Sequence, residues 1–308
     1  MLDILAIGDA IVDKVISFDI KDPVMQKILP VKGLFFNASE TEHSHLRKQL
    51  PLACYAGGSA ANTIRNMGLL GIKTGFLGKV GNDDDGIFFQ DSLNRYGVRS
   101  YLLKTDHDRT GCSVVIVHED KDRTQCARPC AANLLMQEEI SDECLNGTRS
   151  ILMEGYMLNR RPELVVDVIE RACQYGVKVY FTLSDVHCVK NKKELIEKLL
   201  DKIEVLFGNE YEFEALNLTS DTFKKTLCVK TCGAKGVEVF NAVTYEKFDV
   251  SFVDEIVNTN GAGDAFASGF LAEFQNNKSF KSCVALGHEI ATYVLKTELS
   301  YLPIDYKR

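Results

Sequence analysis

Short apolar runs alternate along this chain with longer stretches in which apolar residues recur every three or four positions. The runs predict strands and cover residues 4–8, 74–80, 150–155, 177–183, 203–209 and 226–231. The longer stretches predict amphipathic helices and cover residues 59–71, 162–176, 191–202 and 264–277. Strands that alternate with helices in this way are typical of a mostly parallel sheet flanked by helices on both faces. We therefore expect an α/β fold.

Two segments interrupt this alternation. Residues 13–50 and 101–130 contain short alternating runs, several turn residues and little helical pattern, and HEDKDR at 118–123 resembles a hairpin tip. We expect the two segments to pair as a small β-sheet outside the main sheet of one domain that spans residues 1–308. Such a sheet beside an α/β domain of the kind that binds nucleotides suggests a lid that excludes water from the site.

Length and charge narrow the function classes. A chain of 308 residues with 45% hydrophobic residues and a formal net charge of −7 is globular and has no basic footprint for nucleic acid. The N-terminus, MLDILAIGDAIVDKV, lacks the pattern of a signal peptide, and no apolar run approaches the roughly 20 residues of a membrane helix. These features predict a soluble cytoplasmic protein with small-molecule partners, no nucleic acid and no membrane.

The ten cysteines raise the question of a metal or disulfide framework. Cys126 and Cys130 are four apart, as are Cys228 and Cys232, but the chain has no C-x-x-C pair and no matching histidine cluster. Scattered thiols in a chain without a secretory signal are typical of small buried hydrophobic side chains.

The stretch NTNGAGDAF, residues 258–266, lies where a predicted strand gives way to a helix. The chain has no G-x-x-x-x-G-K-[ST], which excludes a P-loop enzyme. Phe266 occupies the third glycine position of a G-x-G-x-x-G fingerprint, which disfavours a dinucleotide-binding dehydrogenase. Gly261, Ala262 and Gly263 can direct backbone N–H groups, together with the positive end of the helix, at an anion. Asp264 could then accept a proton from an attacking hydroxyl. The alternative is that Asp264 is a helix N-cap.

Other polar residues also follow predicted strands, at the edge where ligands bind in such sheets. Gly57 and Gly58 precede a helix that carries Asn62 one turn in, which suits a polar ligand or simply close packing. Asp13 follows the first strand, where it could bind a ligand or be a solvated charge in a loop.

Asn209 and Glu212 are three residues apart and share one helical face, where the carboxylate could organise hydrated Mg²⁺ or complete a capping box. The glycines of TCGAKG at 231–236 close another strand, and the alternative there is a plain hairpin turn.

Together these motifs resemble the ribokinase-like, or PfkB-type, carbohydrate and nucleoside kinases. NTNGAGDAF matches the family signature D-T-x-G-A-G-D-x-F at all but its first position. AGGSAANTIRNMGLLG followed by TGFLGKVGNDDDG matches the N-terminal signature, and NEYE at 209–212 stands where the family has N-x-x-E. Within the family, IGDAIVD, GGSAANT, MEGYML and LSDVHCV are most similar to the adenosine kinase-like branch.

The resemblance implies a small β lid, ATP as phosphate donor, Mg²⁺, and transfer of the γ-phosphate to a CH₂OH group. It implies that Asp264 is the base and that the N–H groups of Gly261, Ala262 and Gly263 form an anion hole. The acceptor would be held by Asp13, Gly57, Gly58, Asn62 and Met157. The nucleotide and its metal would be held by Asn209, Glu212, Thr231, Gly233, Gly236 and His288, with Glu212 reaching Mg²⁺ through water.

Three positions depart from the family pattern. Asn258 replaces the opening aspartate of the signature, which helps to shape a monovalent-cation loop in relatives, and this puts K⁺ activation in doubt. Asp9 stands where many adenosine kinases have asparagine beside the sugar. Met157 occupies a position where some adenosine kinases stack an aromatic ring on the purine, and Tyr156 precedes it.

Three candidate functions remain, ordered by how well the sequence supports each. The first is an ATP-dependent kinase that phosphorylates the 5′-hydroxymethyl of a ribose-containing acceptor, adenosine before others. The second is a sugar kinase of the same family that acts on ribose, fructose or a related sugar. The third is a silent nucleotide-binding regulatory protein, which the intact Asp264, Gly261 and Gly263 disfavour. A monomer or a homodimer is compatible with each.

Overall fold

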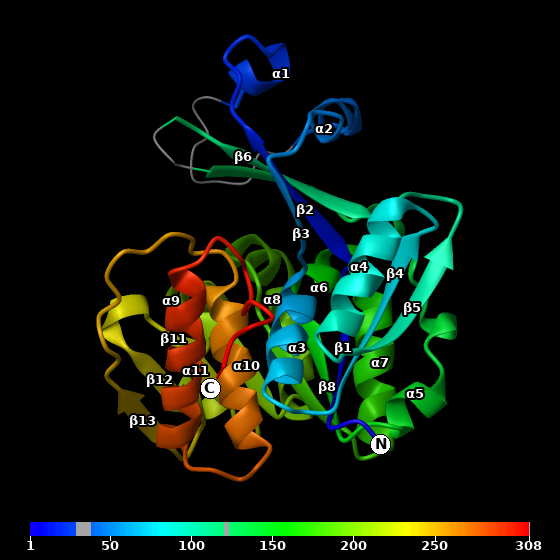
Figure 1. Ribbon diagram of the computed structural model, residues 1–308. Helices are drawn as coiled ribbons and strands as arrows, with labels where there is room; N and C mark the ends of the chain where they lie inside the picture. The colour runs from blue at the N-terminus through cyan, green and yellow to red at the C-terminus, as the bar shows by residue number, and fades with distance from the viewer. Residues whose placement is uncertain (29–37, 120–122, 308) are drawn as a thin grey trace.

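A nine-stranded sheet runs through the centre of the molecule (Figure 1). The computed structural model describes residues 1–28, 38–119 and 123–307. The strand order is β13-β12-β11-β10-β9-β8-β1-β4-β5; β11 through β5 pair in parallel, whereas β12 and β13 are antiparallel. Its strands are β1 (Ile4–Ile7), β4 (Thr74–Gly81), β5 (Arg99–Thr105), β8 (Ser150–Glu154), β9 (Lys178–Thr182), β10 (Val205–Asn209), β11 (Leu227–Thr231), β12 (Val237–Phe240) and β13 (Tyr245–Phe248). The predicted α/β fold is confirmed.

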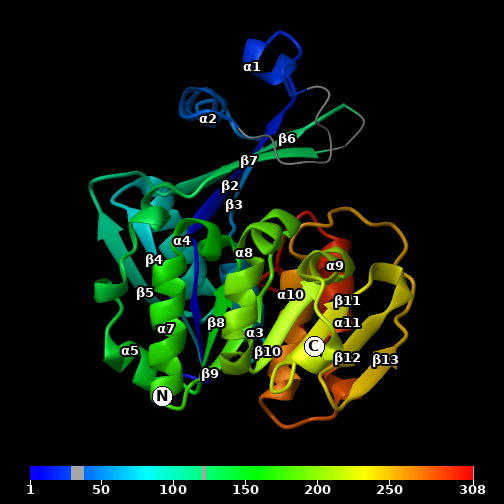
Figure 2. The same ribbon diagram turned by 180° about the vertical axis from the view of Figure 1, so that it is seen from behind.

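Helices cover both faces of this sheet, as Figures 1 and 2 show from opposite sides. One face packs against α3 (Ser59–Leu69), α4 (Asp84–Arg95), α10 (Ala262–Phe274) and α11 (Phe280–Leu295). The other packs against α5 (Asp142–Asn146), α7 (Pro162–Gln174), α8 (Val186–Leu199) and α9 (Glu210–Leu216). In α7 the buried residues Leu164, Val165, Val168, Ile169 and Ala172 form the apolar stripe that its sequence predicts. The alternating faces of the strands thus bury two separate hydrophobic cores.

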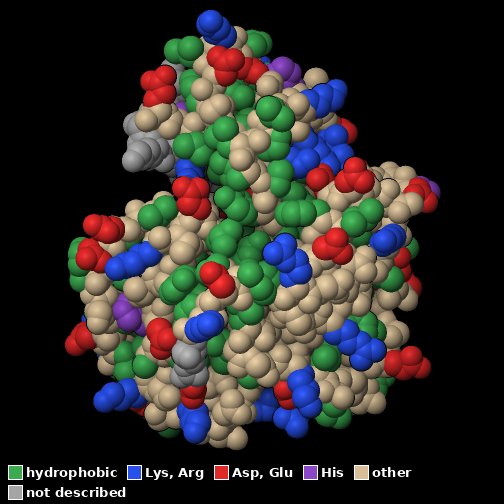
Figure 3. Space-filling model, in the orientation of Figure 1, with side chains coloured by type: hydrophobic (Ala, Val, Ile, Leu, Met, Phe, Trp, Pro, Cys, Tyr) green, Lys and Arg blue, Asp and Glu red, His purple; other side chains and the backbone are tan. Residues whose placement is uncertain are grey.

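A second, four-stranded sheet stands above the carboxyl ends of the large sheet (Figure 1). Its order is β3-β2-β6-β7, with β2 (Ile11–Ser17), β3 (Ala53–Ala56), β6 (Gly111–Val117) and β7 (Arg123–Arg128). Two helices, α1 (Pro23–Gln26) and α2 (Glu40–Arg47), lie at its outer end. A small core of its own includes Ile16, Met25, Leu46 and Ile116. We call this sheet with α1 and α2 the lid; on the left side of Figure 3 a notch separates it from the wider body of the molecule.

The chain segments of the lid differ in detail from the sequence-based boundaries. Residues 101–105, which the pattern placed in the lid, belong to β5 and pair with β4 in the large sheet. The lid also includes residues 53–56 of β3, which pair with β2. Strands β6 and β7 are antiparallel neighbours, but the expected hairpin tip includes residues 120–122, which lie outside the described part of the chain. Residues 29–37 of the expected lid segment also lie outside it.

The helix predicted at 191–202 begins earlier and ends sooner. Helix α8 begins at Val186, because Asp185 caps it by accepting the N–H groups of His187 and Cys188. Lys192 has non-helical backbone angles inside α8, and the last predicted turn is a short 3₁₀ segment, Leu200–Lys202. The capping residue lies outside the amphipathic stretch, so periodicity alone missed this start.

All ten cysteines are free thiols, and most of them are buried. Within the described residues, no group of three or more His, Cys, Asp or Glu side chains is arranged to hold a metal ion. Nor does any helix in the described ranges have the length and apolar character needed to cross a membrane.

Candidate active site

Two cavities meet at the carboxyl ends of the large sheet. The lid cavity, about 540 Å³, lies beneath the lid and is lined by residues that include Asp9, Asp13, Gly58, Asn62, Glu154 and Arg160. The β10 cavity, about 410 Å³, is lined by residues that include Thr182, Asn209, Glu212 and Thr231. Both are lined by Ser59, Tyr156, Asn260, Gly261 and Asp264. Asp264 therefore lies where two ligands bound in the two cavities would meet.

The carboxylate of Asp264 is held by helix α3. Asp264 is the third residue of α10, and Gly261 is the residue that precedes the helix, so Asp264 does not cap it. The Ser59 hydroxyl donates to Oδ1 of Asp264 at 2.6 Å, and Nδ2 of Asn62 donates to Oδ2 at 3.1 Å. These bonds connect residues about 200 positions apart in the chain and orient the carboxylate into the site.

Two glycines allow the backbone to approach closely at this junction. Gly261 has φ of 78°, and a Cβ atom there would lie 2.1 Å from the carbonyl oxygen of Ser300. Gly58 has φ of 89°, and its Cβ would lie 2.4 Å from the carbonyl oxygen of Asp9. Any side chain at either position would combine a strained backbone with a steric clash. The glycines of both sequence motifs are therefore required by the way in which the two helix starts meet.

Burial and nearby charges set the acidities of Asp264 and Asp13. Burial raises the pKa of Asp264 to about 6, against the lowering effect of its bonds from Ser59 and Asn62. Burial also raises the pKa of Asp13 to about 7; the Arg65 charge opposes this rise and the Asp264 charge adds to it. A carboxylate with a pKa near 6 is largely ionised at neutral pH and is a stronger base than an exposed aspartate. Asp264 is thus suited to accept a proton.

The β10 cavity brings together the predicted pair Asn209 and Glu212. Glu212 accepts N–H groups from the Asn209 backbone and side chain at 2.9 Å, and Asn209 accepts the Glu212 backbone N–H at 2.9 Å. The pair is therefore a capping box for α9. Burial raises the pKa of Glu212 to about 7. Carboxylate and amide oxygens facing a cavity also fit a hydrated Mg²⁺, so the capping and metal interpretations are compatible.

Several residues expected in the site line neither cavity. Gly57 packs against the Asp13 carboxylate, where a Cβ atom would lie 2.3 Å from Oδ2. Ala262 begins α10, and its N–H is 3.4 Å from the Thr259 carbonyl oxygen. Met157 is fully buried in a hydrophobic core, whereas its neighbour Tyr156 lines both cavities. The role of Met157 beside an acceptor stays a prediction, and in this structure its side chain packs in the core.

The other residues predicted to bind the nucleotide, Gly233, Gly236 and His288, lie outside the wall of the β10 cavity. Gly233 begins a 3₁₀ turn between the antiparallel strands β11 and β12, and Gly236 ends it, which is the hairpin alternative. His288 lies on α11, with Nε2 3.5 Å from the Thr292 hydroxyl, and is not part of the β10 cavity wall. Of the predicted nucleotide residues, Asn209, Glu212 and Thr231 are brought together.

The sequence patterns missed four residues with prominent positions. Ser59 holds Asp264. Glu154, the last residue of β8, accepts the backbone N–H groups of Asp9 and Ala60 at 2.8 Å. Arg160 and Arg161 both form ion pairs with Asp9. Glu154 ends a predicted strand, so the strand-end argument that found Asp13 could have found it; the arginines gave no such signal.

The loop around Asn258 is closed by hydrogen bonds of the Asn258 amide. Nδ2 donates to the Glu298 carbonyl at 3.0 Å, and Oδ1 accepts the Asn260 N–H at 3.1 Å. Asn258 is 5% exposed and carries no charge. An uncharged side chain whose donor and acceptor are both used in this way does not fit the role of an anionic support for a monovalent cation.

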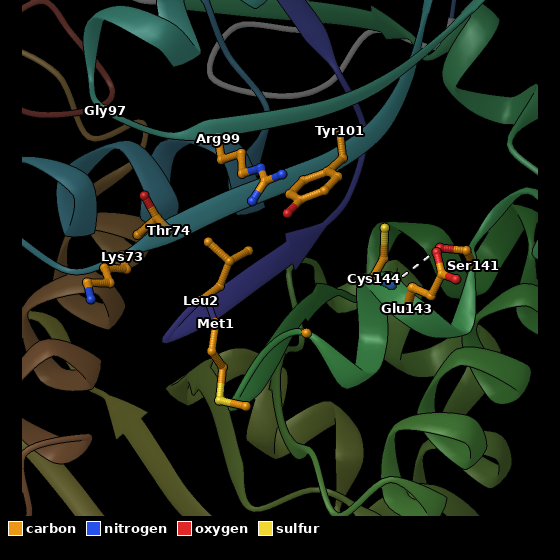
Figure 4. A pocket seen from close by; sticks show the side chains of 11 residues that line it. Met1, Leu2, Lys73, Thr74, Gly97, Arg99, Tyr101, Ser141, Glu143 and Cys144 are labelled. Carbon is orange, nitrogen blue, oxygen red and sulfur yellow. Dashed lines mark hydrogen bonds between the residues drawn. The ribbon is translucent and has the colours of Figure 1, made fainter.

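A third cavity, about 750 Å³, lies at the opposite edge of the large sheet (Figure 4). Its wall includes Leu2, Thr74 and Arg99, where β1, β4 and β5 begin, together with Glu143 and Cys144 of α5. Ligands of parallel α/β sheets bind at the carboxyl ends of the strands, whereas this cavity is at their amino ends. It is therefore not the candidate active site.

Comparison with known proteins agrees with this geometry. The family described as pfkB family carbohydrate kinase matches residues 29–305. The adenosine kinase of Schizosaccharomyces pombe is 27% identical over 301 residues, covering 88% of this chain and 88% of the relative. The 5-dehydro-2-deoxygluconokinase of Geobacillus thermodenitrificans is 26% identical over 291 residues, covering 85% and 84%.

Among solved structures, the adenosine kinase from Sinorhizobium meliloti superposes with a TM-score of 0.85 at 26% identity, covering 98% of this chain and 96% of that chain. The fold, the joined cavities and a family match over most of the chain agree. The chain belongs to the pfkB family of carbohydrate kinases and is a phosphotransferase that acts on an alcohol group.

Proposed function

We propose that this enzyme transfers the γ-phosphate of ATP to the hydroxymethyl group of a ribose-containing or related acceptor, with Asp264 as the general base. The observation that supports this most directly is the position of Asp264, which lines both cavities and is oriented by Ser59 and Asn62. In this arrangement the acceptor occupies the lid cavity and the ATP phosphates occupy the β10 cavity. The acceptor hydroxyl then attacks the γ-phosphorus in line with the leaving oxygen of ADP, and Asp264 accepts the proton of that hydroxyl.

The other residues position charge around the transferred group. The N-terminus of α10, with the backbone of Gly261 and Gly263, faces the cavities and favours the negative charge of the phosphoryl group. Asn209 and Glu212 would hold hydrated Mg²⁺, which neutralises phosphate charge when bound. Strands of the lid supply Asp13, Ser113 and Gln125 to the cavity wall, so lid closure would exclude water.

Adenosine is the first candidate acceptor. It rests on the similarity of GGSAANT, MEGYML and LSDVHCV to the adenosine kinase-like branch and on relatives that are named adenosine kinase. The lid cavity, at about 540 Å³, is within the range of ordinary small-molecule sites. Tyr156 is placed to contact a base from the cavity wall.

A sugar is the second candidate, and one observation favours it. Met157, the residue expected against the purine, is buried in the core, while the wall it was expected to form includes the charged side chains of Asp9 and Arg160. Polar walls of this kind suit hydroxyl groups better than an apolar base. The relative named 5-dehydro-2-deoxygluconokinase supports the same candidate.

The base assignment is tested by Asp264→Asn. General-base catalysis contributes roughly 10²–10⁴-fold, so kcat should fall by about that factor, while calorimetry shows ATP binding within a few-fold of wild type. ADP release is measured with Mg-ATP and a panel of adenosine, inosine, cytidine, ribose, fructose, D-ribonate and D-gluconate. The matched control is Asp201→Asn, an exposed aspartate that lines neither cavity.

Two results would count against the proposal. Asp264→Asn with activity within a few-fold of wild type would remove Asp264 as the base. ATP binding without acceptor-dependent ADP release would favour the nucleotide-binding regulatory protein instead.

A further inference from the structure

A charged group of three side chains, Asp9, Arg160 and Arg161, lies at the wall of the lid cavity. Asp9 follows β1 and the arginines end α6 (Tyr156–Arg160) and precede α7. Each arginine pairs with a different oxygen of the Asp9 carboxylate. The side chain of Arg161 is 8% exposed and also donates to the Ala132 carbonyl at 2.5 Å, whereas that of Arg160 is 29% exposed and lines the cavity. Arg160 is thus the member of the group that a ligand can reach.

The charges in this group do not balance. Two guanidinium groups, each with one positive charge, share one carboxylate. A carboxylate carries a single negative charge whichever of its oxygens are bonded, so it neutralises only one of them. A second acid, Glu154, is 1% exposed and accepts the backbone N–H of Asp9. Burial and the Asp9 charge raise the pKa of Glu154 well above its usual range, so it is largely uncharged at neutral pH. One positive charge therefore remains at this part of the wall.

Three further acids line the lid cavity, and none of them is ion-paired with Arg160. Asp264 is bonded to Ser59 and Asn62, and Asp13 responds to the charges of Asp264 and Arg65. A third acid, Asp185, lines the same cavity and accepts the backbone N–H groups of His187 and Cys188 as the cap of α8. An anionic acceptor would be repelled by Asp13 and Asp264 and attracted by Arg160. This polarity would turn its uncharged hydroxymethyl end toward Asp264, which is the orientation that phosphoryl transfer requires.

We propose that the acceptor carries a carboxylate, as in a sugar acid, and that Arg160, held by Asp9, is the residue that binds it. This inference rests on the proposed function and chooses the second acceptor candidate over adenosine. A guanidinium held on one side by a carboxylate still presents N–H donors on its other side, and a planar fork of donors matches a carboxylate in two parallel hydrogen bonds. Arg160 is thus a specificity-determining residue.

Matched acceptor pairs test the proposal. D-ribonate and D-ribose share a terminal hydroxymethyl, as do D-gluconate and D-glucose, and each pair differs by a carboxylate. Calorimetry on the full chain should show that the acid of at least one pair binds roughly 10- to 100-fold more tightly than its neutral partner and than adenosine. Equal binding, tighter binding of the sugar or adenosine, or no measurable binding of either acid would overturn the proposal.

Variants of Arg160 assign the preference to this residue. Arg160→Gln should bring the ratio of acid to neutral affinity close to one, and Arg160→Lys should keep part of it, because lysine retains the charge without the planar fork. Arg95→Gln, which removes an exposed arginine of α4, should keep the full ratio. Thermal unfolding checks that each variant is folded. An unchanged ratio in folded Arg160→Gln would overturn the assignment.

Asp264→Asn separates this inference from the proposed function. If the sugar acid binds tightly but is consumed equally well by Asp264→Asn and wild type, the proposed function fails while the acceptor class stands. If ADP release depends on Asp264 but a neutral acceptor is preferred, the proposed function stands and the acceptor class fails.

Discussion

Asn258 replaces an aspartate of the family signature, and we expect this one side chain to remove the need of its loop for a monovalent cation. Its amide bonds the Glu298 carbonyl and the Asn260 N–H, so the loop closes on itself. We predict that exchanging K⁺ for Na⁺ changes the rate of the wild-type enzyme by less than about two-fold. Asn258→Asp removes the donor to Glu298 and leaves a buried carboxylate facing a carbonyl, which should cost about 1–3 kcal/mol of unfolding free energy in the absence of K⁺. ADP release and thermal unfolding in each salt measure both effects.

The Asn258→Asp variant also supplies the contrast for this prediction. Added K⁺ should raise its Tm more than that of wild type, because a cation can bridge the new carboxylate and the Glu298 carbonyl. A strong K⁺ requirement in the wild type would contradict the assignment of Asn258.

At the scale of elements, ion pairs connect the lid to helix α4, which packs on the large sheet. Asp85 in the first turn of α4 pairs with Arg47 of α2 and with Lys14 of β2, the latter at 3.1 Å. These side chains are at most 18% exposed. Asp85→Asn should therefore lower the free energy of unfolding by about 1–2 kcal/mol and speed hydrogen exchange in the lid strands. Urea unfolding and exchange mass spectrometry measure these changes.

Asp84→Asn is the control for this experiment. Asp84 lies in the same first turn of α4 and is exposed, so both variants lose the same favourable interaction with the helix dipole. If the two variants exchange at the same rate in β2 and β6, the ion pairs of Asp85 do not hold the lid.

For the whole molecule, buried acids at the sheet edge should make stability depend on pH. Glu212 is 6% exposed, and burial raises its pKa from 4.5 to about 7. A carboxyl group with a raised pKa in the folded state stabilises the fold fully at pH below its unfolded pKa and loses this contribution as pH rises through the folded pKa. The Tm should therefore fall between pH 5 and pH 8, with Glu212 contributing on the order of 3 kcal/mol at most.

Glu212→Gln tests this assignment, because glutamine also fits a capping box and does not titrate. Calorimetric Tm values from pH 5 to pH 8, without ATP or Mg²⁺, should fall less steeply in the variant. Parallel curves for variant and wild type would show that Glu212 does not titrate in this range.

Local sequence patterns were enough to predict the α/β class, the central strands and the glycine motifs at helix starts. These features are local, because periodicity and turn chemistry act over a few residues. Asn209 and Glu212 could be predicted because they lie at the carboxyl end of β10, at the ligand-binding edge. The strand predicted directly before NTNGAGDAF is not observed, because residues 249–261 form no strand, and Asp13 lies within β2 of the lid. Asp264 and Asp13 were therefore found by their motifs. Motif resemblance then added the order of these segments along the chain.

Which side chains meet depends on the packing of the whole chain. Ser59 reaches Asp264 across 205 positions, and Arg160 reaches Asp9 across 151. Met157 turns into the core while Tyr156 faces the cavities, a choice that depends on how α6 packs. Contacts of this kind depend on strand order and helix packing, which bring together residues whose local patterns carry no mutual signal. The identity of the acceptor depends on these contacts, because charge around the cavity is assembled from distant segments.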